Sequence, residues 1–291
     1  MAIKKFWLAA GALAVLFSLP LFRLARFAIG DELHSYIVII PAVTLYLIRL
    51  RRGNLPVVST SAIPAALFSL AGLAVLAWHW LAPRAGLADN LMQTTLAFLL
   101  LLTAAGFWFL GAGFMRAILF PFSLLVFMIP LPDAMRDALE SFLQHGSAVV
   151  AGWMFTVAGL PVLQDGLAFK LPGITLRVAP ECSGIHSTMV LFITSLVAAN
   201  MFLRSPVRRV ALCLVVLPLA LLRNGFRVFV LGELCAHIGA HMIDSPIHHR
   251  GGPLFFVLSL VPFFLMLWWL RRSELAGAKP EKKAAPVPTK T

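Results

Sequence analysis

The sequence is short of charge. Only 12% of its 291 residues are charged, whereas about 25% are charged in an ordinary soluble domain. Hydrophobic residues make up 60% of the chain, against roughly 45–50% in soluble domains. This composition excludes a soluble enzyme, a disordered chain and a collagen-like fibre. It also argues against a protein that binds nucleic acid, although the net charge is +12.

Cysteine is scarce as well. The chain has only Cys182, Cys213 and Cys235, too few and too odd in number for a disulfide framework, and no two of them form a CxxC pair. The histidines between 237 and 249 complete no recognised ligand set for a metal. We therefore predict neither a metal site nor another cofactor.

The sequence contains several long apolar runs with few or no charged residues. A helix needs about 20 mostly apolar residues to cross the bilayer core, and backbone polar groups in lipid must be satisfied within the segment. We predict an all-α membrane protein, a polytopic bundle of about eight transmembrane helices. The expected spans are 6–23, 34–49, 62–82, 91–110, 114–131, 184–203, 208–232 and 253–270.

Basic residues predict the orientation of this bundle. With both termini in the cytoplasm, most Lys and Arg residues fall in inner loops and the tail, and most acids fall outside. Arg23 and Arg26 follow the first apolar run, so an uncleaved span is favoured over a signal peptide. We expect one integral membrane domain over 1–275. A basic, disordered cytoplasmic tail over 276–291 would lie near anionic lipid.

The stretch between the fifth and sixth spans departs from this pattern. Residues 134–160 are apolar enough to enter the membrane, but a full crossing would place the basic loop at 204–209 outside, against the charge rule. We expect an interfacial or re-entrant helical element there. Two short alternating runs around Pro172 and Gly173 predict an outer β-hairpin.

Two arginines lie inside the seventh predicted span, where charge is costly and indicates a functional site by default. Arg223 and Arg227 share a helix face, and Asn224 lies three residues before Arg227. The structural alternative is that one or both arginines reach the interface or pair with Glu233.

Cys182 lies between the predicted hairpin and the start of the sixth span, beside Glu181, Ser183 and Gly184. The N-terminus of a helix favours a thiolate, so Cys182 is a candidate nucleophile. The alternative is a small buried hydrophobe, and we accept that alternative for the other two cysteines.

His248 and His249 precede the eighth predicted span at its outer end. Histidine is the commonest general base; the alternative is a pair of solvated loop histidines. The predicted topology places three residues at the same depth, at or just below the outer surface of the membrane: Cys182, Arg227 and His248.

Three runs of these residues resemble the exosortase/archaeosortase family. They are Glu181-Cys182-Ser183-Gly184-Ile185, Asn224-Gly225-Phe226-Arg227-Val228, and His248-His249-Arg250-Gly251-Gly252 followed by Phe255-Phe256. The resemblance covers roughly 30–270 and is most specific in the approach Pro-x-Cys-Ser-Gly. It departs at His34-Ser35-Tyr36, where many members of the family carry Ser-His-Gly.

The resemblance implies a membrane-embedded cysteine peptidase or transpeptidase with 1–275 as its catalytic domain. Such an enzyme cleaves C-terminal, PEP-CTERM-like sorting signals of exported proteins, which are its expected partners together with membrane lipids. The resemblance also implies a bacterial inner membrane and an active site at the periplasmic face. It does not indicate whether water or an unknown acceptor attacks the enzyme-bound intermediate in the second half of the reaction.

The resemblance assigns roles to residues as well. It implies Cys182 as nucleophile, Arg227 as stabiliser of the oxyanion or the thiolate, and His248 as general base and acid, with His249 as its substitute. Supporting roles are expected for Asn224, Arg223, Glu181, Ser183 and Gly184.

Two other functions remain open from the residues. One is a transporter, which a charge pathway or repeated halves would indicate. The other is a protein of lipid or polysaccharide assembly in which Arg223, Arg227 and Arg250 clamp an anionic head group.

Overall fold

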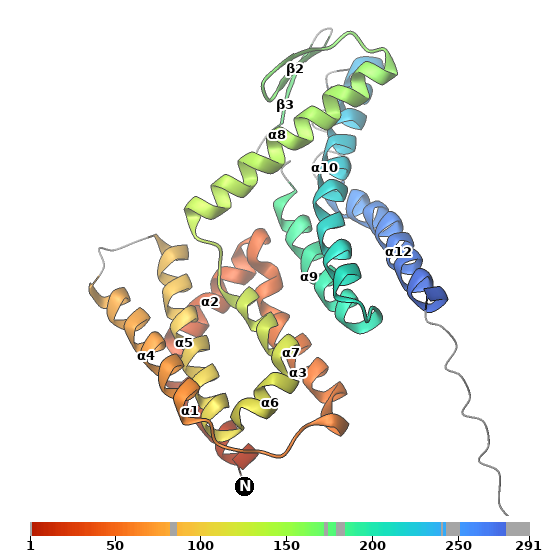
Figure 1. The fold of residues 1–291 in the computed structure, drawn as a ribbon. Helices are drawn as coiled ribbons and strands as arrows, with labels where there is room; N and C mark the ends of the chain where they lie inside the picture. The colour runs from red at the N-terminus through yellow and green to blue at the C-terminus, as the bar shows by residue number, and fades with distance from the viewer. Residues whose placement is uncertain are drawn as a thin grey trace, which may run out of the picture. The chain divides into compact units, whose positions relative to one another are not determined.

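Helices form nearly all of the computed structural model, which describes residues 2–81, 86–171, 174–178, 184–239, 241–242 and 251–277 (Figure 1). In this described part, six helices are long and apolar enough to cross a membrane. Two bent helix pairs raise the number to eight if each pair is one span. The predicted all-α bundle of about eight spans is confirmed, and the chain is a multi-pass membrane protein.

The chain divides into two compact units, Met1–Glu140 and Ser141–Thr291. In the first unit, α4 packs along α5, and α1 and α2 also contact α5. The elements of this unit are α1 (Ala2–Leu16), α2 (Ser18–Gly30), the 3-10 helix η1 (Glu32–Val38), α3 (Ile40–Leu50), η2 (Arg52–Asn54), α4 (Ala62–Leu81), α5 (Leu87–Phe109), α6 (Gly111–Ala117), α7 (Leu119–Ser123) and η3 (Leu124–Met128). One domain over 1–275 and a disordered tail over 276–291 stay predictions.

Two of the expected spans, 6–23 and 114–131, are not straight helices. α1 and α2 meet at 74°, and α6 meets the α7–η3 segment at 79°. Pro20 and Pro121 account for the breaks, because a proline ring clashes with the carbonyl four residues earlier. That carbonyl belongs to the last residue of α1 in one case and of α6 in the other. Each pair is a broken span or a re-entrant pair.

The helical element expected over 134–160 is α8 (Asp133–Ala158), one continuous helix of 26 residues. It is not among the helices apolar enough to span a membrane, and its interfacial or re-entrant placement stays a prediction. The other elements of the second unit are β1 (Leu163–Asp165), β2 (Ala168–Leu171), β3 (Ile174–Arg177), α9 (Ile185–Phe202), α10 (Pro206–His237) and α12 (Gly252–Gly277).

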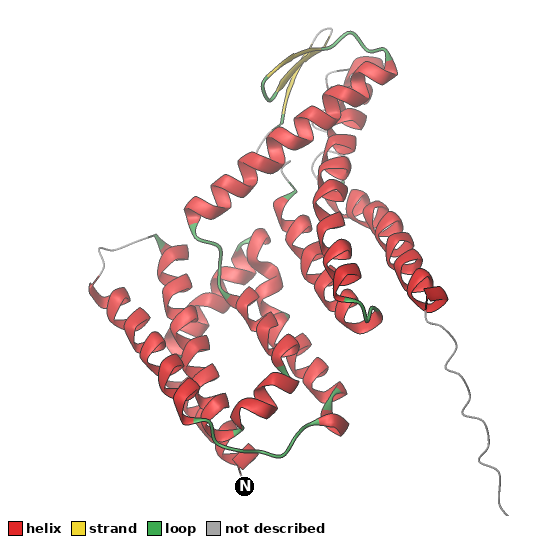
Figure 2. Cartoon of the chain, viewed as in Figure 1, coloured by secondary structure: helices red, strands yellow, loops and turns green. Residues whose placement is uncertain are grey.

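The predicted β-hairpin is confirmed as β2 and β3, which pair antiparallel with Leu171 opposite Ile174. A third strand that we did not predict, β1, pairs antiparallel with β2 (Figure 2). Gly166 makes the turn between β1 and β2 with a φ of +60°, a conformation that glycine adopts without steric cost. Phe169 on β2 is fully buried and packs against Phe155 of α8, with ring centroids 5.3 Å apart.

Glycines let α8 approach α10 closely. A Cβ atom at Gly225 of α10 would lie 2.6 Å from Cγ1 of Val150, and one at Gly146 of α8 would lie 2.7 Å from Cδ2 of Leu221. Side chains at these two positions would push the helices apart, as in membrane bundles where small residues line helix interfaces. α8 therefore packs against the face of α10 that carries Leu221 and Gly225, whereas Arg223 and Arg227 lie on another face of that helix.

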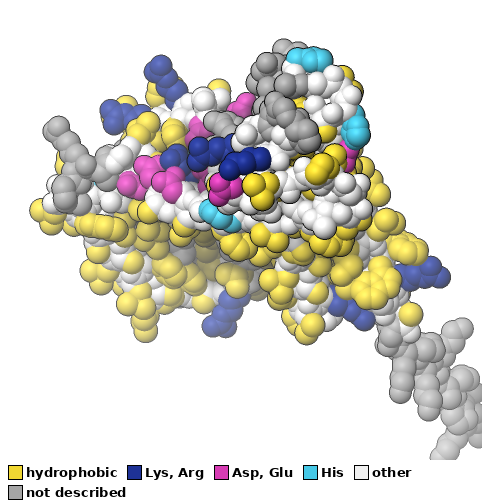
Figure 3. Space-filling model, turned by 90° about the horizontal axis from the view of Figure 1, so that it is seen from above, with side chains coloured by type: hydrophobic (Ala, Val, Ile, Leu, Met, Phe, Trp, Pro, Cys, Tyr) yellow, Lys and Arg dark blue, Asp and Glu magenta, His cyan; other side chains and the backbone are white. Residues whose placement is uncertain are grey.

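Apolar side chains are exposed along many helices, including Trp7, Trp80 and Trp269. Figure 3 shows hydrophobic side chains over broad areas of the viewed face, with charged side chains in smaller groups. Exposed apolar surface on this scale is expected where lipid replaces water as the solvent.

Candidate functional site

The site begins at Gly184, the residue before α9. Its φ is +65°, in the left-handed region where a residue other than glycine is strained. A Cβ atom here would also collide with the side-chain amide of Asn224 on α10. Position 184 therefore excludes every side chain for two independent reasons, and the start of α9 lies directly against α10.

Arg223 of α10 holds the start of α9 in place. Its Nη2 donates hydrogen bonds to the carbonyl of Gly184, at 3.2 Å, and to Oγ1 of Thr188, at 3.3 Å. Its Nε donates to Oδ1 of Asn224 at 3.1 Å. The two hydrogen bonds to Gly184 and Thr188 hold the start of α9 against α10, and the bond to Asn224 orients the planar guanidinium on α10.

The charge of Arg223 is buried among neutral groups. The residue is 7% exposed, and its three hydrogen bonds within the described ranges all go to uncharged acceptors. Glu233, the acid considered as its alternative partner, instead lies 3.1 Å from Nε2 of His237. Nη1 of Arg223 is buried without a hydrogen-bond partner among the described residues. One strong donor is therefore left for another group.

Arg227 lies one helical turn further along α10, on the same face as Arg223. It is half-buried. Its neighbour Phe226 contacts Phe255 in the first turn of α12 edge to face, with ring centroids 6.1 Å apart. The beginnings of α9 and α12 therefore both pack near the same two turns of α10.

The structure brings together four of the predicted residues: Gly184, Arg223 and Asn224 are in contact, and Arg227 lies one turn away. The other predicted residues lie outside the described part of the chain. They are Cys182, Glu181, Ser183, His248 and His249. In the sequence, Gly184 directly follows Ser183, and Gly251 comes two residues after His249.

Thr188 belongs to the site, and our sequence analysis missed it. Its Oγ1 donates to the carbonyl of Gly184 at 2.8 Å while accepting from Arg223. The signal was present, because residues four apart share a helix face and Thr188 lies four positions after Gly184. We read position 188 as part of an apolar span and gave its hydroxyl no role.

The arrangement is a cluster of hydrogen-bond donors in apolar surroundings. Within the described ranges, no group of three or more His, Cys, Asp or Glu residues is placed to hold a metal ion. Fixed donors in a site that excludes water stabilise developing negative charge more strongly than they would in water. The described side chains therefore form a site suited to binding a group that carries or develops negative charge.

Comparison with known protein families finds one match, to the family described as Transmembrane exosortase (Exosortase_EpsH), over residues 24–265. No curated protein and no solved structure matches the chain. The family match spans both units and contains every residue of the candidate site.

Proposed function

The chain belongs to the transmembrane exosortase family, and on that premise we propose that it is a membrane-embedded cysteine peptidase or transpeptidase. Its substrates would be exported proteins with a C-terminal, PEP-CTERM-like sorting signal. Membership makes the chain a membrane protein of sorting-signal processing; the cysteine chemistry and the residue roles are the proposal.

One observation carries this proposal: the buried Arg223 holds the residue that follows the Cys182–Ser183 pair. Gly184 accepts a hydrogen bond from Arg223 through its carbonyl. Two peptide bonds separate Gly184 from Cys182, and consecutive Cα atoms are about 3.8 Å apart. A thiolate at 182 would thus work beside the donor cluster and near the N-terminus of α9, which favours negative charge.

The reaction proceeds in two halves. The Cys182 thiolate attacks the scissile carbonyl, the oxyanion forms and collapses to a thioester, and the amide C–N bond breaks. His248 gives its proton to the leaving amine and then takes one from water or an acceptor amine, whose attack breaks the thioester. Arg227 stabilises the oxyanion, because a fixed cation in a water-poor site needs no reorganisation when the charge develops.

Arg223 acts as a positioning residue in this mechanism. Its bonds to Gly184 and Thr188 orient the start of α9. Its buried Nη1 keeps one donor for the segment before Gly184 or for a polar atom of the substrate. This second function gives a reason for a charged side chain at this buried position.

We further propose that the site opens on the periplasmic side of a bacterial inner membrane, with both termini in the cytoplasm. The distribution of Lys and Arg supports this orientation. Family membership favours sorting-signal processing over the transporter and over the lipid- or polysaccharide-assembly protein that the residues alone left open.

The test is cleavage of a reporter that carries a PEP-CTERM-type signal, co-expressed with the full chain. We expect wild type to shorten the reporter and Cys182→Ala to leave it intact, with both proteins present equally in the membrane. Cys213→Ala is the matched control, because Cys213 is a partly buried free thiol on α10 and should leave cleavage unchanged. Cleavage by Cys182→Ala would exclude Cys182 as the nucleophile.

A second readout identifies the covalent step. Acid quenching during turnover should trap the reporter fragment on wild-type protein through a bond that hydroxylamine releases, as a thioester requires. Arg227→Ala and His248→Ala should reduce both trapping and cleavage. Trapping on a protein that lacks Cys182 would contradict the proposed mechanism.

A further inference from the structure

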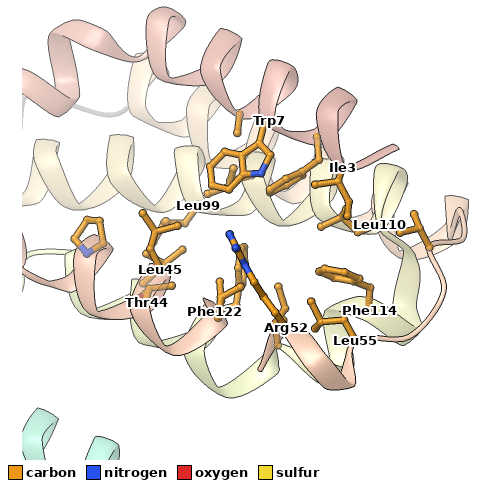
Figure 4. Close-up of a pocket in the computed structure, with 18 of the residues that line it drawn as sticks. Ile3, Trp7, Thr44, Leu45, Arg52, Leu55, Leu99, Leu110, Phe114 and Phe122 are labelled. Carbon is orange, nitrogen blue, oxygen red and sulfur yellow. The ribbon is translucent and has the colours of Figure 1, made fainter. Parts of the chain in front are cut away.

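The first unit contains an apolar cavity of about 760 Å³ (Figure 4). α1, α3, α5, α6 and the segment after α3 line it with side chains such as Trp7, Leu99 and Phe114. Its volume lies within the range of about 300–1,000 Å³ that is typical of ligand sites. The candidate catalytic residues all lie in the second unit, so this cavity is a separate feature.

An arginine points into this apolar space. Arg52 of η2 directs its guanidinium between Leu45 and Trp7 (Figure 4). Among the residues that the structure describes, Arg52 forms no hydrogen bond and no ion pair. The adjacent Arg51 behaves differently, since its Nη1 donates to the carbonyl of Ala117 at 3.0 Å. Arg52 is exposed as well as part of the cavity lining, so its guanidinium is free to pair with an anionic group that enters the cavity.

A second polar group in the cavity wall lacks a partner. Thr44 of α3 is 2% exposed, and its hydroxyl has no hydrogen-bond partner within the described ranges. A threonine inside a helix usually donates to the carbonyl one turn back. Thr103 of α5 does so, with its Oγ1 2.7 Å from the carbonyl of Leu99. Thr44 keeps its donor for something that enters the cavity.

The charges around the cavity have one sign. The elements that line it, together with the residues next to them, carry Lys4, Lys5, Arg49, Arg51, Arg52 and Arg116. Among the acids of the first unit, Asp89 lies in the first turn of α5, whereas the cavity-lining residues of that helix begin at Phe98. The other acids lie on other elements or loops: Asp31, Glu32, Asp133, Asp137 and Glu140. By the charge rule this end faces the cytoplasm, where the membrane leaflet holds anionic lipids.

We propose that this cavity binds one anionic glycerophospholipid from the surrounding bilayer. An acyl chain fills the apolar space, the phosphate pairs with the guanidinium of Arg52, and the hydroxyl of Thr44 donates to an ester carbonyl. The three features of the cavity, its apolar wall, its inward cation and its spare hydroxyl donor, match the three parts of such a lipid.

A transmembrane peptide fits the cavity less well. A basic peptide end would be repelled by Arg52, which belongs to the cavity lining. The occupant that the charge favours is therefore an anionic lipid, with one acyl chain in the apolar space.

The test uses the full chain in mild detergent, with phosphatidylglycerol and phosphatidylcholine of equal chain length as probes and native mass spectrometry as the readout. We expect Arg52→Gln to weaken phosphatidylglycerol binding about tenfold, the loss expected for one charge-assisted hydrogen-bonded pair. Arg49→Gln is the matched control. Arg49 is an exposed arginine on α3 outside the cavity wall, so its loss should change binding less than twofold.

Further probes separate a lipid site from other sites. Thr44→Val should weaken phosphatidylglycerol binding without changing the monodispersity of the protein, and glycerol 3-phosphate without chains should not compete. Equal effects of the two arginine variants would overturn the proposal, as would equal binding of phosphatidylcholine. Competition by glycerol 3-phosphate would show a phosphate site rather than a lipid site, and a co-purified peptide in the cavity would show a different occupant.

Discussion

The two units treat buried polar groups differently. In the first unit such groups are uncharged or lie beside an acid: Gln93 lies 2.9 Å from Nδ1 of His79, and the fully buried His34 lies 2.8 Å from Asp31 and accepts from the backbone N–H of Leu131. In the second unit a buried arginine instead links two long helices, because Arg223 of α10 bonds to the start of α9. In the second unit, these bonds hold the guanidinium of Arg223 in one position and one orientation against α9.

Helix continuity follows the same division. The first unit contains both bent helix pairs and the cavity, whereas α10 runs unbroken through 32 residues. A long helix packed on several sides provides a rigid support for catalytic groups, and such support is what an acyl-transfer site requires. We therefore expect chemistry to respond sharply to changes in the second unit and weakly to matched changes in the first.

The largest effect is expected at Arg227. Replacing it with alanine removes the proposed oxyanion stabiliser, so reporter cleavage should fall by about 10²–10³. The same change at Arg49 of the first unit, an exposed position, should leave cleavage within twofold. A similar loss of cleavage at both positions would contradict the claim that the reaction is more sensitive to changes in the second unit than in the first. The measurement is the initial rate of cleavage per membrane-inserted enzyme.

The second-largest effect is expected for Gly184→Ala, which should lower the cleavage rate about 10²-fold. The alanine must adopt a φ of +65° and its Cβ would displace Asn224, which together cost a few kcal/mol and shift the residues before α9. Gly11→Ala in α1 is the control, because a Cβ there meets nothing within 4 Å. If both variants retained full activity, the close contact at 184 would have no bearing on the reaction.

Apolar runs and charge predicted most of this fold, because the cost of unsatisfied backbone in lipid leaves few alternatives to helices. The breaks at Pro20 and Pro121 were not predicted, although both lie four residues after a helix end. Proline alone would not have sufficed as a signal, since Pro218 and Pro262 lie inside α10 and α12. A proline in an apolar run therefore marks a possible kink without distinguishing a kink from a break.

The candidate site was predictable only where residue type and spacing carry information. Arg223, Arg227 and Asn224 stood out because polar groups in a span are costly. The bond between Arg223 and Gly184 joins residues 39 positions apart, and no local pattern encodes such a contact. The acid named in the structural alternative, Glu233, lies 3.1 Å from His237 one turn further along α10, and the described hydrogen bonds of Arg223 go to other residues.

A smaller loss is expected at Arg223. Arg223→Lys keeps the charge but replaces the planar fork with a single ammonium, which cannot reproduce bonds to Gly184, Thr188 and Asn224 at once. We expect kcat to fall about tenfold with KM unchanged, and Arg223→Ala to lower kcat further. Equal kcat for Lys and Ala variants, or a change confined to KM, would contradict a positioning role.

The smallest effect is expected for Thr188→Val, which tests whether a hydrogen bond between α9 and α10 contributes more to stability than one within α9. Thr188→Val removes the hydroxyl that accepts from Arg223 and donates to Gly184. Interhelical hydrogen bonds in membrane proteins contribute about 0.6 kcal/mol on average and at most about 1.7 kcal/mol, and we expect a loss in this range in the free energy of unfolding. Thr194→Val is the matched control, because the one hydrogen bond that its hydroxyl makes among the described residues stays within α9, to the carbonyl of Val190 at 2.8 Å. Unfolding in mixed micelles should show a larger loss for the first variant, and equal losses would mean that Arg223 does not link α9 to α10.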